Sequence, residues 1–70
     1  MNRKDDAIPA LMEIGEYLGT TERFLDESAT RIRIRLNCTG TEAGQILNDL
    51  REHGEVDFEM RPDGGRTKRR

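Results

Sequence analysis

The chain has 70 residues, of which 37% are charged and 33% hydrophobic, and its formal net charge is −2. This length allows one domain with a thin core, and no stretch approaches the roughly 20 apolar residues of a membrane-spanning helix. A single cysteine excludes an intrachain disulfide, and the N-terminus lacks the apolar run of a signal peptide. We therefore expect a cytoplasmic location, no membrane association, and a homodimer as one way to complete the core.

The first segment, Asp5 to Gly19, has the spacing of an amphipathic helix. Asp6 is suited to cap it, Pro9 falls in the first turn, and Gly19 is suited to a left-handed stop. Apolar side chains recur on one face at Ala7, Leu11, Ile14 and Leu18.

Residues 20–29 fit a short second helix, an irregular loop or a short edge strand. Ile14 to Leu25 also has the rhythm of a helix-turn-helix, with Gly19 at the turn. This motif is not favoured, because its second helix would be net acidic and DNA would repel it.

Thr30 to Asn37 alternates charged and aliphatic residues, and this period of two predicts a β-strand. The strand would direct one set of side chains to the core: Ile32, Ile34 and Leu36. It would direct the other set outward: Arg31, Arg33 and Arg35.

Thr39 and Glu42 form a capping box, which predicts a helix from this point to about His53, ended by Gly54. Its apolar stripe consists of Ala43, Ile46, Leu47 and Leu50. Its water-facing side consists of Gln45, Asn48, Asp49, Arg51 and Glu52.

Glu55 to Arg61 alternates again and predicts a second strand, with Val56, Phe58 and Met60 facing inward. The turn residues 62–65 should end it. Residues 66–70 are then either a basic tail or a returning hairpin strand. The chain thus divides into a compact domain, 1–61, and a basic flexible tail, 62–70.

These elements predict an α+β fold in the order α-β-α-β, with a single-layer sheet of two or three strands packed on two helices. The segment between the two strands is long enough for a right-handed crossover, which would make the strands parallel. A third strand would come from residues 21–27, the tail or a second subunit.

The arginine strand and the tail favour binding to a nucleic acid or nucleoprotein, because exposed cations spaced along a strand can follow phosphates. The candidate residues are Arg31, Arg33, Arg35, Arg66, Lys68, Arg69 and Arg70. The alternative is that the carboxylates of Glu55, Asp57 and Glu59 neutralise the arginine row across neighbouring strands.

A second hypothesis is a protein-binding inhibitor or adaptor that uses the acidic N-terminal helix and residues 20–29. Its candidate contacts are Glu13, Glu16, Tyr17, Arg23 and Phe24. In either case we expect a small accessory or regulatory protein and not an enzyme. Cys38 and His53 flank a helix about 20 Å long, so they cannot form a dyad, and no catalytic residue, metal or cofactor is expected.

Overall fold

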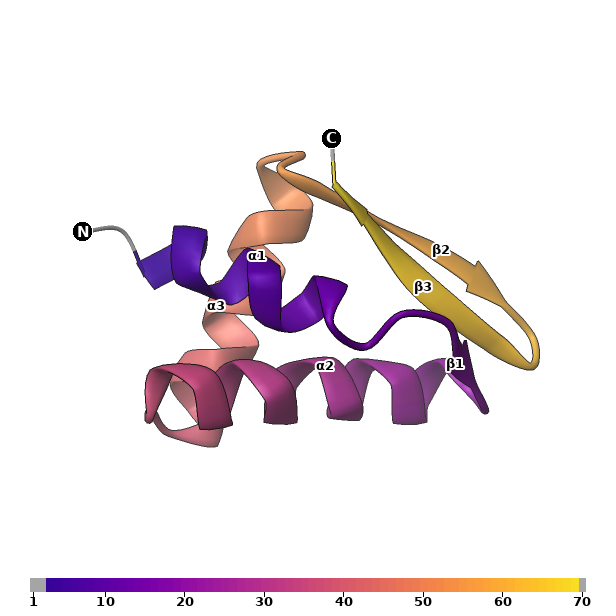
Figure 1. Ribbon diagram of the computed structural model, residues 1–70, viewed down its shortest axis with the longest axis horizontal. Coiled ribbons are helices and arrows are strands. Elements are labelled where there is room, and N and C mark those ends of the chain that lie inside the picture. The colour runs from indigo at the N-terminus through magenta and orange to yellow at the C-terminus, as the bar shows by residue number, and fades with distance from the viewer. Residues whose placement is uncertain (1–2, 70) are drawn as a thin grey trace.

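The computed structural model describes residues 3–69, which form three helices and one three-stranded sheet. In chain order the elements are α1 (Arg3–Met12), β1 (Tyr17–Leu18), α2 (Thr21–Leu36), α3 (Gly40–Glu52), β2 (Val56–Arg61) and β3 (Gly64–Arg69). The three helices lie together, and the β2–β3 hairpin extends away from them toward the start of α2 (Figure 1). The α+β class with a single small sheet is confirmed, with three helices in place of two.

Helix α1 begins before Asp5 and ends well before the predicted stop at Gly19. Its last turn tightens, because Ile14 N–H donates to the Leu11 carbonyl oxygen at 3.2 Å. Gly15 then adopts a φ of 65°, a left-handed conformation that glycine tolerates and that ends the helix. Pro9 lies inside the helix and not in its first turn.

The predicted strand from Thr30 to Asn37 is wrong, because these residues form the second half and the C-cap of helix α2. Thr20 caps it by accepting a hydrogen bond from the Arg23 N–H at 3.2 Å. The buried residues follow a helical period of four rather than an alternating one: Phe24, Ser28 and Ile32. Ile34, which a strand would have buried, is 65% exposed.

Helix α3 confirms the capping box. The Thr39 hydroxyl accepts from the Glu42 N–H at 3.1 Å and donates to the Glu42 carboxylate at 3.3 Å. The helix reaches Glu52, His53 caps its end, and Gly54 follows with a φ of 69°. The predicted stripe is buried at Ala43, Leu47 and Leu50.

The sheet has the order β1-β3-β2, and both pairs are antiparallel, so the predicted parallel crossover is wrong. The second predicted strand is confirmed as β2. The hairpin turn at Pro62 and Asp63 leads directly into β3, so residues 64–69 form the returning strand and not a free tail. Arg70 lies outside the described residues.

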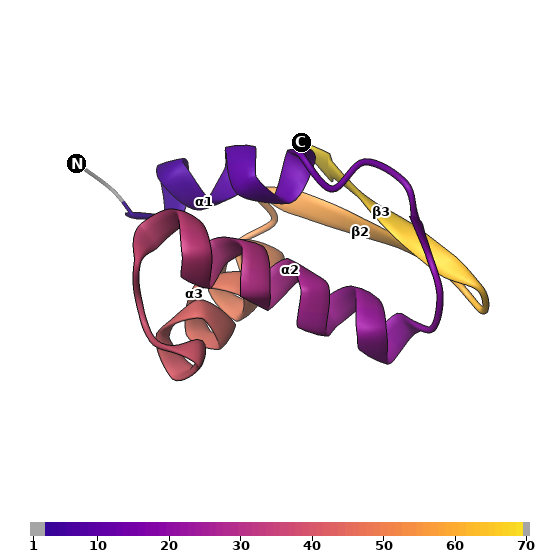
Figure 2. The same cartoon turned by 60° about the horizontal axis from the view of Figure 1, so that its bottom comes forward.

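The core lies where the three helices meet the inner face of the sheet (Figure 2). Phe24 is fully buried, and its ring lies 5.8 Å from Tyr17 and 5.9 Å from Phe58, between centroids. Each helix and β2 contribute to the main cluster: Ala7, Ile8, Leu11, Ile32, Ala43, Leu47, Leu50 and Val56. None of the helices within residues 3–69 is long and apolar enough to cross a membrane.

Candidate nucleic-acid interface

Helices α2 and α3 are joined by the three residues Asn37–Thr39 and form a helix-turn-helix. Asn37 turns the chain in the left-handed conformation, with φ and ψ of 51°, and Cys38 N–H donates to the Arg33 carbonyl oxygen at 3.1 Å. Figure 1 shows α3 crossing α2 rather than running alongside it. The motif thus lies one helix later than the Ile14–Leu25 segment, which contains β1.

The outward side of α3 carries small and uncharged residues over its first three turns and the exposed carboxylate of Glu52 at its end. Thr41, Gly44, Gln45 and Asn48 are all exposed, and we call them the α3 polar face. Within residues 3–69, the three polar side chains of this face make no hydrogen bond to the protein. Their donors and acceptors are therefore available to an external ligand.

Two of the acidic residues of α3 are engaged away from this face. Glu42 interacts with Thr39 at the helix N-terminus. Asp49 lies 3.9 Å from the Lys4 ammonium of α1. Glu52 stays exposed at the last position of the helix.

The three arginines predicted on a strand do not share one side of α2, since Arg31 and Arg35 lie on one side and Arg33 on another. Arg31 pairs with Glu27 at 2.9 Å and Arg35 with Glu13 at 3.1 Å. Arg33 lies about 200° around the helix from Arg31, because successive helical residues are about 100° apart. It is exposed, has no ion pair within the described residues, and lines a hollow of about 420 Å³ beside Gly40.

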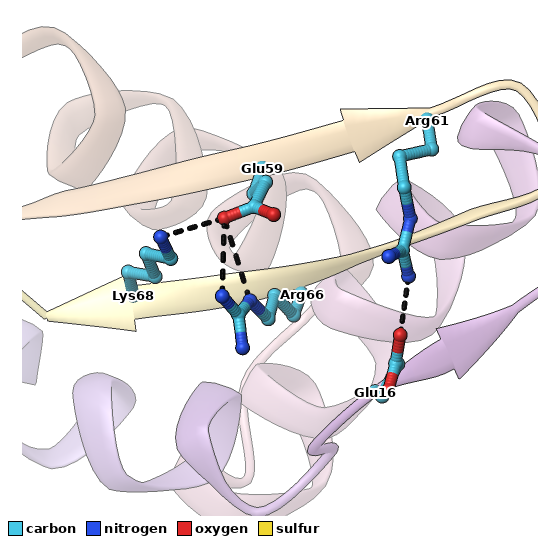
Figure 3. Close-up of polar contacts among 5 residues, drawn as sticks. All are labelled: Glu16, Glu59, Arg61, Arg66 and Lys68. Carbon is cyan, nitrogen blue, oxygen red and sulfur yellow. Dashed lines mark hydrogen bonds and ion pairs between the residues drawn. The ribbon is translucent and has the colours of Figure 1, made fainter.

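The basic residues of β3 lie next to the carboxylates of β2. Arg66 and Lys68 both contact Glu59, at 3.4 and 2.7 Å (Figure 3). The predicted neutralisation of Arg31, Arg33 and Arg35 by β2 carboxylates is therefore wrong, and Glu59 pairs with cations of β3 instead. Arg69 is exposed without an ion pair within residues 3–69.

The Glu59 pair predicts a specific pH dependence. The hydrogen bond from Lys68, assisted by the charge of Arg66, lowers the pKa of Glu59 below its ordinary value of 4.5. A lowered carboxyl pKa stabilises the fold above the unfolded value, and this stabilisation is lost as pH falls through the folded value. We therefore expect Glu59→Gln to reduce the fall of the melting temperature below about pH 4.5, measured by circular dichroism.

The matched control for this pH experiment is Glu55→Gln. Glu55 immediately precedes β2 and has no ion pair within the described chain, so its replacement should leave the acid limb of the profile unchanged. Identical profiles for wild type and Glu59→Gln would contradict the assignment.

Arg51 borders the other end of the α3 polar face. Its guanidinium carbon lies 5.4 Å from the centre of the Phe58 ring, which stabilises it by a cation–π contact. Asn48, Arg51 and Glu52 line a hollow of about 350 Å³. The polar face is therefore bordered by Arg33 near its first turn and Arg51 near its last, and neither has an ion pair among residues 3–69.

The residues of the alternative protein-binding surface do not form one free patch. Glu13 is paired with Arg35, and Glu16 with Arg61 (Figure 3). The side chain of Phe24 is inaccessible, and Tyr17 is half-buried against it. Arg23 alone is exposed without an ion pair in the described structure.

Within residues 3–69, no group of three or more His, Cys, Asp or Glu side chains is placed to hold a metal ion. Comparisons of the chain with protein-family models, with curated proteins and with solved structures found no match. The candidate interface therefore rests on the geometry of the chain alone.

Sequence reasoning placed Gln45 and Asn48 correctly on the water-facing side of a helix but did not treat them as a site. The signal that could have identified the helix-turn-helix was the capping box at Thr39, which comes three residues after the end of α2. Because residues 30–37 were assigned to a strand, the helix-turn-helix of α2 and α3 was not predicted. The α3 polar face was therefore not recognised as part of a candidate DNA-binding motif.

Proposed function

We propose that this chain is a small non-catalytic accessory or regulatory protein that binds double-stranded DNA, with α3 in the major groove. The observation that carries the proposal is the α3 polar face, on the second helix of a helix-turn-helix. That helix is the one that enters the groove in such motifs. The B-DNA major groove is about 12 Å wide, which admits an α-helix.

The hairpin supports the same function. A short strand before the helix-turn-helix and a β-hairpin after it give a winged helix-turn-helix arrangement, in which β2 begins directly after α3. Arg66 and Lys68 share the Glu59 carboxylate, and residues 56–69 carry a net charge of +1, with four basic and three acidic side chains. These cations are suited to phosphates at the edge of the groove.

The charge distribution sets a limit on affinity. Helix α3 is itself net acidic, with Glu42, Asp49 and Glu52 against Arg51, so attraction to phosphates must come from cations beside the helix. Four described arginines have no ion pair to an acidic side chain: Arg23, Arg33, Arg51 and Arg69. Each phosphate that a cation neutralises contributes about −0.9 to the slope of log K against log salt. We expect binding in the micromolar range at low salt, with a slope of about −4 or shallower.

The test is fluorescence anisotropy with a labelled mixed-sequence duplex at several salt concentrations. Arg33→Gln should weaken binding and reduce the slope by about 0.9, because it removes a free cation beside α3. Arg31→Gln is the matched control on the same helix, since Arg31 is engaged with Glu27. Absence of duplex binding even at low salt would refute the proposed function.

A further inference from the structure

The α3 polar face has the chemistry of a base-reading surface. Gln45 and Asn48 are three residues apart, so they lie on the same side of the helix, about 4.5 Å apart along its axis. Base pairs in B-DNA are spaced by about 3.4 Å, so two side chains at this separation reach neighbouring base pairs.

The side-chain types favour adenine and thymine. A glutamine or asparagine side chain can form a bidentate pair with adenine, because its NH2 donates to N7 and its oxygen accepts from the N6 amino group. A threonine methyl can contact the thymine methyl. Guanine is read mainly by arginine or lysine, and the four residues of the α3 polar face include neither. Arg51, the one basic residue of α3, is held against Phe58 at the border of the face.

Gly44 is a second, independent feature of this face. It lies in the interior of α3, where glycine favours the helix less than alanine does. Core packing does not require it, because a Cβ built on Gly44 meets no atom within 4 Å. A glycine here keeps the helix surface low between Thr41, Gln45 and Asn48, so that the backbone can approach base edges closely.

We propose that α3 reads A·T base pairs in the major groove, with Gln45 and Asn48 bound to successive adenines and Thr41 against a thymine methyl. This inference rests on the proposed DNA-binding function and adds base preference to it. The expected ligand of the α3 polar face is therefore a DNA duplex that contains adjacent A·T pairs.

The first experiment compares two labelled duplexes of equal length, one of A·T pairs and one of G·C pairs, at one low salt concentration. The wild-type protein should bind the A·T duplex at least tenfold more tightly. Gln45→Ala and Asn48→Ala should each weaken binding to the A·T duplex at least about 5-fold, without weakening binding to the G·C duplex. An A·T duplex with 7-deazaadenine, which lacks the major-groove N7 acceptor, should lose the preference.

The outcomes separate the two proposals. Equal affinity for both duplexes refutes the base preference and leaves the DNA-binding function standing, whereas binding to neither refutes both. An unchanged preference for the 7-deazaadenine duplex shows that the A·T pairs are read elsewhere, which also refutes the inference. Equal losses of both duplexes on Gln45→Ala and Asn48→Ala would show backbone contact rather than base reading.

A second variant tests the glycine. Gly44→Glu should retain the helical circular dichroism spectrum and a melting temperature at or above wild type, because glutamate favours helix over glycine. It should weaken binding to the A·T duplex at least tenfold by its bulk and charge. Met12→Glu, at an exposed position beside the end of α1, adds the same charge and should change affinity less than twofold. Wild-type affinity of Gly44→Glu would overturn the placement of α3 in the groove.

Discussion

Replacement of Ile32 by alanine is expected to lower the free energy of unfolding by about 2–5 kcal/mol, the usual cost of truncating a buried aliphatic side chain. The same change at Ile34 is expected to cost less than about 0.5 kcal/mol. The reason is position on α2: Ile32 is 0% exposed and Ile34 is 65% exposed, although only one residue separates them. Urea denaturation followed by circular dichroism measures both values.

This pair of variants also tests the helical assignment of residues 30–36 directly. On a strand the two isoleucines would share one face, and their truncation would have similar costs. Because Ile32→Ala can unfold so small a domain outright, Ile32→Val provides a milder variant, with an expected loss of about 0.5–1.5 kcal/mol. Equal losses for Ile32→Val and Ile34→Val would contradict the structure.

Replacement of Gly64 by alanine is the second change with a large expected effect, a loss of about 1–3 kcal/mol. A Cβ on Gly64 would overlap the Tyr17 carbonyl oxygen, which is backbone and cannot move without breaking the β1–β3 pair. For a domain of this size each kcal/mol lowers the melting temperature by about 4–8 °C.

Gly44→Ala is the matched control for Gly64→Ala, since the same methyl group enters open space on a helix. It is expected to stabilise the fold by about 0.5–1 kcal/mol, so the two substitutions should shift the melting temperature in opposite directions. Thermal unfolding of the three proteins under one condition makes the comparison. A neutral Gly64→Ala would show that β1 does not pair with β3 in solution.

Local signals predicted α3 and β2 well. The bonds between Thr39 and Glu42 form within one turn, so they can be read from four residues of sequence. The alternation from Val56 to Met60 likewise reports a strand with one covered face. These elements depend little on what the rest of the chain does.

Helix α2 could not be read in the same way, because two periodicities overlap in it. Arg31 to Leu36 alternates perfectly, yet the buried stripe begins at Phe24 and continues through Ser28 to Ile32. Ser28 weakens the apolar signal, although its hydroxyl is satisfied by the Phe24 carbonyl oxygen at 2.8 Å. Tertiary packing therefore decided between helix and strand.

Strand β3 shows the same limit for the sheet. Gly64 and Gly65 have low strand propensity, and a basic end of a chain usually frays. Their lack of side chains is what the fold uses: a Cβ on Gly65 would lie 2.9 Å from the Glu59 carbonyl oxygen and 3.2 Å from the Phe24 ring. Prediction of the candidate site needed the same long-range information. The α3 polar face is recognised as a candidate interface only when α2 is known to be the first helix of the motif.

The pairing of Tyr17 with Gly65 has a consequence for how the protein is made. The two partners are 48 positions apart in the sequence, so this pair of strands cannot form until Gly65 has been synthesised. Helices α2 and α3 need only contacts between neighbouring segments and can form earlier, because local contacts form faster than distant ones. We therefore expect the hairpin to dock after α2 and α3 have formed, and Phe24 to lack its contacts with Phe58 and Gly65 until then.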